Sequence, residues 1–338
     1  MRWHNLSVET EGRARLPGYR DGAVVRHFEA PGAVKTRFYE VRAKSILNRV
    51  PAASQMPFRW TINPYRGCSH ACVYCFARPT HTFLDFDAGR DFEREIVVKV
   101  NAPEVLRVEL ARPSWSGEHV ALGTNTDPYQ WAEGRYRLMP GIWEALRDAA
   151  NPCSVLTKSP LLVRDLALMK EISERTEFSA ALSVPTLDER AWRATEPHTP
   201  NPRARLEAVA ELTRAGISTG VLIAPLMPGI NDAPEQIEPI LALAAEAGAA
   251  YVTGLALHLR RGVREVFFAW LEAERPELVE RYQKLYRRSA YAPPEERKRL
   301  TRLVKGPDLS PFQRIRGRVI ERGTTKPASR ETLQERLF

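Results

Sequence analysis

The sequence has no long hydrophobic run, no apolar stretch within its first twenty residues and no repeats, and each absence argues against a class of protein. No apolar stretch approaches the roughly 18 residues that span a bilayer, which argues against a membrane-spanning chain. The first twenty residues start basic but contain no apolar stretch, which predicts no secretory signal and a cytoplasmic location. Neither an internal repeat nor a low-complexity segment is present, so a solenoid is not expected.

Cysteine is also scarce, with 4 residues in a chain of 338. Three of the four lie within the eight residues 68–75, whereas a disulfide framework would distribute its cysteines along the chain. Clustered cysteines in a cytosolic protein more often bind a metal. The fourth, Cys153, stands apart, and we expect it in the hydrophobic core.

Acidic residues are in deficit at both ends of the chain, and the net charge is +9. Residues 1–50 carry ten Lys and Arg against five Asp and Glu, and residues 289–338 carry twelve against six. The segment between them is slightly acidic. Basic ends of this kind are typical of contact with a polyanion such as DNA or RNA, although solvated tails and helix faces are the alternative.

Short apolar runs alternate with longer amphipathic segments from about residue 58 onward. The runs cover 59–65, 119–124, 153–158, 177–184, 217–225 and 250–259. Nearly continuous apolar runs are typical of strands buried on both faces of a parallel sheet. The segments between them predict helices over 102–112, 136–150, 159–175, 201–216, 233–248 and 261–274. Six βα units are too few for a complete eight-stranded barrel, so we predict an α/β fold with a partial (β/α)6 barrel.

The barrel is expected to carry an extension at each end. Residues 1–57 form an N-terminal extension in this interpretation, with a strand and a short helix in 32–50. Residues 58–285 form the barrel, and residues 286–338 form a basic C-terminal extension rich in Pro, Arg and Lys. The run 96–100 predicts one additional short strand. Ser159 and Pro160 are expected to start a helix as its cap and first residue.

The cysteine cluster has the spacing Cys68-x3-Cys72-x2-Cys75 and follows the first predicted strand. This places it at the carboxyl end of the strands, where barrel enzymes carry out their chemistry. Iron–sulfur clusters are usually held by four cysteine thiolates. Three ligands would leave one iron of a four-iron cubane free to bind a substrate. Gly67 allows the backbone to approach such a cluster closely.

Three other interpretations of the cysteines stay open at this point. A Cys3His zinc site would use His70 or His81 as its fourth ligand and would stabilise a nucleic-acid-binding protein without radical chemistry. Zinc sites usually pair two cysteine knuckles, and the sequence contains no second knuckle. The cysteines could otherwise be inert core residues, or they could hold a cluster that only carries electrons.

The segment NPYRGCSHACVYCFARPTH (63–81) resembles the radical SAM superfamily, whose motif CxxxCxxC has an aromatic residue before the last cysteine. Tyr74 fills that place. The stretches GCSHACVYCFARPTH, ALGTNTDPYQ, VLTKSPLLVRDL and ALSVPTLDE are similar to the spore photoproduct lyase-like branch. The resemblance covers roughly residues 58–285.

This resemblance implies an enzyme of lyase or transferase type that uses two cofactors, a 4Fe–4S cluster on the three cysteines and S-adenosylmethionine. The free iron would chelate the amino and carboxylate groups of S-adenosylmethionine. One electron, from a reductant such as flavodoxin or ferredoxin, would then release a 5′-deoxyadenosyl radical that abstracts hydrogen from the substrate.

The resemblance also assigns roles to polar residues at the ends of later strands. Asp127 would accept from the methionine ammonium, Lys158 would pair with the carboxylate, and Ser183 would contact the carboxylate or the ribose. Thr124 and Asn125 offer short polar groups in the same turn as Asp127. The turn 224–229 resembles the adenine-contacting segment. The alternative for each of these residues is a capping or packing role.

The substrate and the residue that returns hydrogen are not predicted by the sequence. The basic ends and the spore photoproduct lyase resemblance favour a nucleic acid, while a peptide or a small metabolite stays open. Cys153 begins the third predicted strand, roughly 16 Å from Lys158 at its end, so we do not expect it to donate hydrogen.

Overall fold

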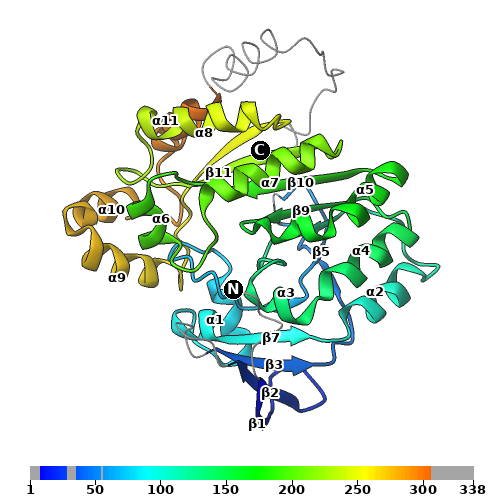
Figure 1. Ribbon diagram of the computed structural model, residues 1–338. Coiled ribbons are helices and arrows are strands. Elements are labelled where there is room, and N and C mark those ends of the chain that lie inside the picture. The colour runs from blue at the N-terminus through cyan, green and yellow to red at the C-terminus, as the bar shows by residue number, and fades with distance from the viewer. Residues whose placement is uncertain (1–7, 29–35, 55, 306–338) are drawn as a thin grey trace.

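A computed structural model describes residues 8–28, 36–54 and 56–305 (Figure 1). Its larger sheet has seven strands in the order β12-β11-β10-β9-β8-β5-β4. The strands are β4 (Leu47–Arg49), β5 (Trp60–Ile62), β8 (Val120–Leu122), β9 (Cys153–Thr157), β10 (Phe178–Ser183), β11 (Thr219–Leu226) and β12 (Val252–Ala256). All but β4 pair in parallel. The six predicted strands are therefore confirmed, and they form a partial barrel.

The helices between the strands cover the outside of this sheet (Figure 1). Those predicted from the sequence are α2 (Ala102–Leu110), α4 (Leu138–Asp148), α5 (Leu166–Arg175), α7 (Pro202–Arg214) and α8 (Pro234–Glu246). The predicted helix α9 (Arg264–Glu274) follows the last strand and packs in a separate hydrophobic cluster that contains Cys72 and Tyr74. Shorter helical segments not predicted are α1 (Arg90–Arg94), α3 (Trp131–Tyr136), α6 (Glu189–Thr195), α10 (Val279–Leu285), η2 (Arg78–Leu84) and η4 (Pro276–Leu278).

The segment 159–175 is not one α-helix, because its first part is the 3₁₀ helix η3 (Pro160–Asp165). Ser159 caps this segment as predicted, since its Oγ accepts from the Leu161 N–H at 3.2 Å. Pro160 follows at the first helical position, where the absence of an N–H costs nothing.

A second, smaller sheet joins the N-terminal residues to the barrel segment. Its order is β1-β2-β3-β7-β6, formed by β1 (Val8–Ala14), β2 (Ala23–Phe28), β3 (Arg37–Val41), β6 (Tyr65–Arg66) and β7 (Glu95–Lys99). The additional strand predicted over 96–100 is thus present but belongs to this sheet. Figure 1 shows the smaller sheet below the barrel.

The short helix expected within 32–50 is not found in the described part of that range, and this prediction was wrong. Residues 47–49 instead form β4, which pairs antiparallel with the edge strand β5. The Glu109 carboxylate on α2 accepts from the N–H groups of Ile46 and Leu47 at 2.9 and 3.0 Å, which holds the chain extended. Tertiary contacts therefore override the local helical pattern.

Helix α11 (Pro294–Lys305) packs against the last strand of the barrel. Its Leu300 and Val304 are fully buried in the main hydrophobic core, which also contains Cys153 as predicted. A Cβ on Gly254 of β12 would lie 2.7 Å from the Val304 side chain, so helix and strand are in close contact. The rest of the basic region predicted after residue 286, from residue 306 on, lies outside the described residues. Among the described helices, none combines the length and the hydrophobicity that crossing a bilayer requires.

Candidate active site

The loop that carries the three cysteines follows β6 and is fixed by its backbone. Gly67 has φ +79°, and a Cβ there would lie 2.9 Å from the Phe92 carbonyl oxygen. Any other residue would collide with that backbone while adopting an unfavourable conformation. The Cys68 N–H donates to the same Phe92 oxygen at 2.9 Å. The glycine thus places the first cysteine against the α1 segment.

Arg78, a residue that sequence reasoning missed, holds the middle of this loop. Its side chain is completely buried, and its guanidinium donates to the carbonyl oxygens of Cys72 and Ala71 at 3.0 and 3.2 Å. The charge is balanced by an ion pair with Glu93. Because an arginine supplies five fixed donors, it can tie several carbonyls of an irregular loop together. Nothing in the local pattern distinguishes this arginine from the other basic residues of the chain.

Gln130 and Thr126 hold the opposite side of the loop. The Ser69 N–H donates to Gln130 Oε1 at 2.9 Å, and Thr126 Oγ1 donates to the Gly67 carbonyl oxygen at 2.7 Å. These two residues belong to the turn that follows β8, so the cysteine loop is attached to the second βα unit. Gln130 was also missed by the sequence analysis.

One cavity of about 270 Å³ lies at the carboxyl ends of the strands and brings the predicted site residues together. Among the residues that line it are Cys68, Cys72, Cys75, Tyr74, Thr124, Asn125, Asp127, Lys158 and Ser183. The apolar turn at Ala224 and Pro225 lines it as well, next to Leu255 and Leu257 of the β12 segment. Every residue assigned to the site from the sequence therefore faces the same space.

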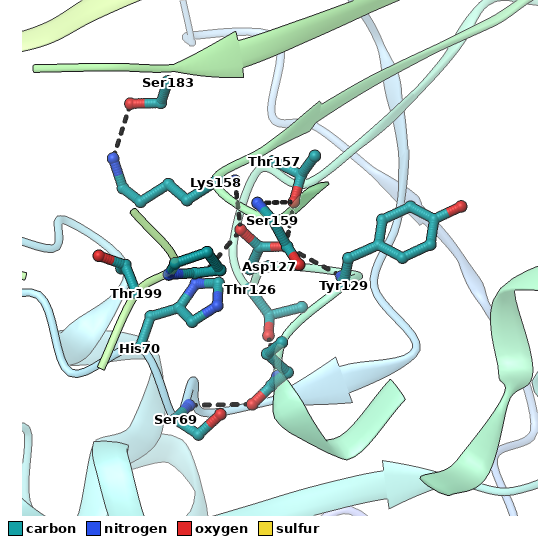
Figure 2. Close-up of polar contacts among 12 residues, drawn as sticks. Ser69, His70, Thr126, Asp127, Tyr129, Thr157, Lys158, Ser159, Ser183 and Thr199 are labelled. Carbon is teal, nitrogen blue, oxygen red and sulfur yellow. Dashed lines mark hydrogen bonds and ion pairs between the residues drawn. The ribbon is translucent and has the colours of Figure 1, made fainter. Parts of the chain in front are cut away.

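Asp127 lies in the turn after β8 and accepts several hydrogen bonds from the protein itself (Figure 2). Its Oδ1 accepts from Thr157 Oγ1 at 2.6 Å and from the Tyr129 N–H at 2.9 Å, and its Oδ2 accepts from the Lys158 N–H at 2.8 Å. Burial raises the pKa of this carboxyl, but His70 and these hydrogen bonds outweigh it and lower the pKa. The ionised carboxylate clamps the turn to the end of β9.

Lys158 directly follows β9 and belongs to an ionic network whose carboxylate, that of Glu196, is buried. Its Nζ donates to Ser183 Oγ at 2.6 Å, as Figure 2 shows, and pairs with Glu196 Oε1 at 2.8 Å. The same ammonium lies 5.5 Å from the centre of the Tyr74 ring. The Tyr74 hydroxyl donates to Glu196 as well. The lysine, the serine and the tyrosine predicted from the sequence are therefore joined through one carboxylate.

Glu196 and Arg205 complete this network, and neither was predicted. Arg205 is completely buried and pairs with Glu196 Oε2 at 2.7 Å, while it also donates to the Ser183 carbonyl oxygen at 2.8 Å. Two cations, Lys158 and Arg205, thus share one anion. Lys158 is the one of these three residues that lines the cavity, and the net positive charge of the three together favours an anionic ligand group beside it.

The donor set fits a 4Fe–4S cluster. Cys68, Cys72 and Cys75 are free thiols that line the cavity together, and burial raises the pKa of each, so a nearby metal cation is needed to make them thiolates. In the described part of the chain, no three His, Cys, Asp or Glu side chains converge on a single metal position. A cubane presents separate iron corners to separate thiolates and requires no such convergence. The zinc alternative gains no support from this geometry.

Unsatisfied polar atoms lie beside these thiols. Thr124 Oγ1 is buried without a hydrogen-bond partner among the described residues, and so is Nε2 of His70, which also lines the cavity; the other ring nitrogen, Nδ1, lies 3.4 Å from Asp127 Oδ2. His81 is buried away from the cavity between Phe86 and Phe92, and burial lowers its pKa to about 4. Buried polar groups in native proteins are nearly always satisfied, so the unsatisfied groups that line the cavity indicate space for a ligand.

A partial parallel barrel with three loop cysteines lining a largely apolar cavity at the carboxyl ends of its strands is typical of a class of iron–sulfur enzyme. Comparison with known proteins gives the family: the model of the radical SAM superfamily matches residues 62–244, and the chain belongs to that superfamily. Members of this superfamily bind a 4Fe–4S cluster and S-adenosylmethionine and need an electron donor. The cluster and S-adenosylmethionine are therefore the cofactors of this enzyme.

Similar proteins extend the comparison beyond the barrel. An uncharacterized protein of Mycobacterium tuberculosis is 48% identical over 308 residues, which is 90% of this chain and 91% of that protein. An uncharacterized protein of Methanocaldococcus jannaschii is 26% identical over 200 residues, covering 59% of this chain and 71% of that protein.

The fold is similar to that of spore photoproduct lyase. A solved structure of a variant with bound AdoMet and dinucleoside spore photoproduct has a TM-score of 0.56 and 15% identity, covering 84% of this chain and 78% of that chain. A second structure, complexed with dinucleoside spore photoproduct, has a TM-score of 0.55, 16% identity and coverage of 85% and 79%. The resemblance to spore photoproduct lyase that the sequence motifs indicated is therefore confirmed for the fold.

Proposed function

We propose that Cys68, Cys72 and Cys75 hold the 4Fe–4S cluster and that S-adenosylmethionine binds beside it in the same cavity. The observation that carries this proposal is that the three cysteines and the polar ends of β8, β9 and β10 line one space. When bound, the two cofactors supply a 5′-deoxyadenosyl radical that abstracts hydrogen from a substrate. The chain's own residues bind and orient the ligands and exclude water.

Lys158 binds the methionine carboxylate in this proposal. An ammonium has three donors, and two of them go to Ser183 and Glu196 within the protein. The third is left for a ligand that enters the cavity. Because Lys158 and Arg205 together outweigh the charge of Glu196, an incoming carboxylate would neutralise the network. Ser183 and Tyr74 orient the lysine from either side.

Asp127, Thr124 and Asn125 bind the remaining polar groups of S-adenosylmethionine. Each carboxylate oxygen has two acceptor positions, and Asp127 Oδ2 takes one conventional hydrogen bond, from the Lys158 N–H. It therefore keeps an acceptor position for the methionine ammonium, although the His70 ring nitrogen lies 3.4 Å away. Thr124 Oγ1 has no protein partner among the described residues and is available to the ligand.

For the substrate class, we infer a nucleic acid component, and for the electron donor a flavodoxin or a ferredoxin. The structural neighbours described above are complexes with dinucleoside spore photoproduct. Phe76 and Leu255 line the cavity and remain 48% and 39% exposed, so the mouth offers apolar contacts for a flat group. A product search by mass spectrometry, with the reduced enzyme and irradiated DNA, tests the substrate class.

The test of the chemistry compares two cysteine variants after anaerobic reconstitution with iron and sulfide. Cys72→Ala should lose the brown absorbance of the cluster and the production of 5′-deoxyadenosine together. Cys153→Ala should keep both, because Cys153 lies in the hydrophobic core at the start of β9. A Cys72→Ala protein that still makes 5′-deoxyadenosine, or a wild-type protein that binds one zinc ion and no cluster, would refute the proposal.

A further inference from the structure

A second cavity is lined mainly by residues of the smaller sheet and its connecting turns. Its volume is about 560 Å³, and it is bounded by the turn between β1 and β2, the segment after β3, strand β6 and the end of β7. Five cations line it: Arg20, Arg42, Lys44, Arg66 and Lys99. The radical chemistry proposed above makes no use of this cavity.

The charge of this cavity is not balanced. Asp21 is the acidic residue in its lining, against the five cations. Within the described ranges, none of the five cationic side chains forms an ion pair or a hydrogen bond. Surface cations that merely face solvent are common, but here they converge on one concave space. A concave cationic site raises the local concentration of anions.

Lys99 distinguishes this cavity from an ordinary basic surface. The residue is 5% exposed at the end of β7, and its side chain lines the cavity. The nearby Glu109 is already engaged by the N–H groups of Ile46 and Leu47. Burial, followed by the charge of Arg66, lowers the pKa of Lys99 to about 7, against the opposing effect of Glu109. A buried ammonium without a partner readily loses its proton, and an anion that enters the cavity would keep it charged.

The rim of the cavity carries an aromatic side chain. Phe83, in η2, lines the cavity and is 74% exposed. An exposed phenyl ring beside a group of cations is the combination that binds a nucleotide, because the base stacks on the ring and the cations contact the phosphate. Arg42 and Lys44 are exposed on the same rim, where they would meet the ligand before Lys99 does.

We propose that this cavity binds the phosphate groups of a nucleotide, with Lys99 at its floor, Arg42 and Lys44 at its rim and Phe83 against the base. The site is separate from the cysteine cavity. The proposal does not rest on the radical chemistry, since binding here requires neither the cluster nor S-adenosylmethionine.

Fluorescence anisotropy with a labelled single-stranded oligothymidine, titrated with the full chain, tests this proposal. We expect binding that weakens with salt. Lys99→Met should weaken it roughly tenfold, as expected for a lost charge-assisted contact, and should reduce the salt slope by about 0.7. Phe83→Ala should weaken binding while leaving the salt slope unchanged.

Two further variants keep the test decisive. The double variant Arg42→Gln/Lys44→Gln changes only exposed side chains, so it is expected to fold and to bind more weakly. Lys284→Met removes an exposed cation that is paired with Glu280 outside the cavity, and it should bind like the wild type. If Lys99→Met and the double variant both bind like the wild type, the proposal is overturned.

Competition identifies the part of the ligand that is recognised. Displacement of the oligonucleotide by ATP at concentrations where inorganic phosphate has little effect supports a nucleotide site. Equal displacement by inorganic phosphate would reduce the cavity to a simple anion site and overturn the role given to Phe83. Production of 5′-deoxyadenosine should be unchanged in Lys99→Met. The nucleotide-binding proposal and the radical-chemistry proposal can therefore be refuted independently of each other.

Discussion

Glu196 is the residue on which the charge arrangement of the cysteine cavity depends. Replacing it by Gln leaves the partly buried Lys158 and the fully buried Arg205 without their shared anion. Breaking a buried ion pair costs about 3–5 kcal/mol, so we expect Glu196→Gln to lower the free energy of unfolding in urea by that amount. Glu189→Gln breaks an exposed pair with Arg193 and should cost about 0.5 kcal/mol or less. Equal losses in the two variants would contradict this account.

Glu196 also makes stability depend on pH in the acid range. Burial raises the pKa of its carboxyl, but Arg205 and Lys158 outweigh burial and lower the pKa from 4.5 to about 2. A group whose pKa is lower in the folded state stabilises the fold above its unfolded pKa. This contribution is therefore full above pH 4.5 and is lost as the pH falls toward 2. Urea midpoints measured across that range should fall less steeply in Glu196→Gln than in the wild type.

Lys158 is expected to decide the affinity for S-adenosylmethionine. Lys158→Met removes a charge-assisted hydrogen bond to the carboxylate, which corresponds to at least roughly tenfold weaker binding. Equilibrium dialysis with the reconstituted protein measures this loss, and the absorbance of the cluster should stay unchanged. Lys170→Met, on the exposed face of α5, is the matched control. Unchanged affinity in Lys158→Met would refute the assignment.

At the scale of elements, two glycines allow two destabilising effects of an added side chain to be measured separately. One effect is the unfavourable backbone conformation, and the other is a collision with neighbouring atoms. Gly123 and Gly216 have nearly equal φ angles, +85° and +86°. A Cβ on Gly123 would lie 1.8 Å from the Leu156 carbonyl oxygen in β9, whereas nothing lies within 4 Å of one on Gly216. Gly216→Ala should therefore cost about 1–2 kcal/mol of unfolding free energy, and Gly123→Ala should cost clearly more. Similar urea midpoints for the two variants would contradict this.

The strands and the sites at their ends were predictable because both depend on local sequence. Strand β10 is buried at every position except the half-buried Ser179, alternate residues of β9 are half-buried, and parallel strands place Lys158 and Ser183 at one edge. Arg78, Glu196 and Arg205 were not predictable, because their roles come from partners distant in the sequence. The same is true of β4, whose strand conformation depends on its pairing with β5.

At the scale of the whole molecule, the two sheets share one core. Phe38 of β3 is 3% exposed and belongs to the same hydrophobic cluster as Ile62 of β5. Strand β3 also pairs in parallel with β7, which follows the cysteine loop. Residues 36–41 are therefore integrated with the barrel through both packing and hydrogen bonds.

This shared core predicts one cooperative unfolding transition. Phe38→Ala should lower the free energy of unfolding by about 3–5 kcal/mol. Loss of far-ultraviolet circular dichroism and loss of cluster absorbance should shift together along the denaturant axis, because the sheet and the loop unfold as one unit. Two separated transitions would show that the N-terminal sheet is an independent unit.

Three successive residues connect the two cavities described above. Arg66 lines the cationic cavity of the smaller sheet, and Cys68 lines the cavity that contains the three cysteines. Gly67, between them, has no side chain and lies against Phe92. A side chain at position 67 would collide with the Phe92 backbone and would displace both neighbours together, so a single substitution there would disturb both cavities at once.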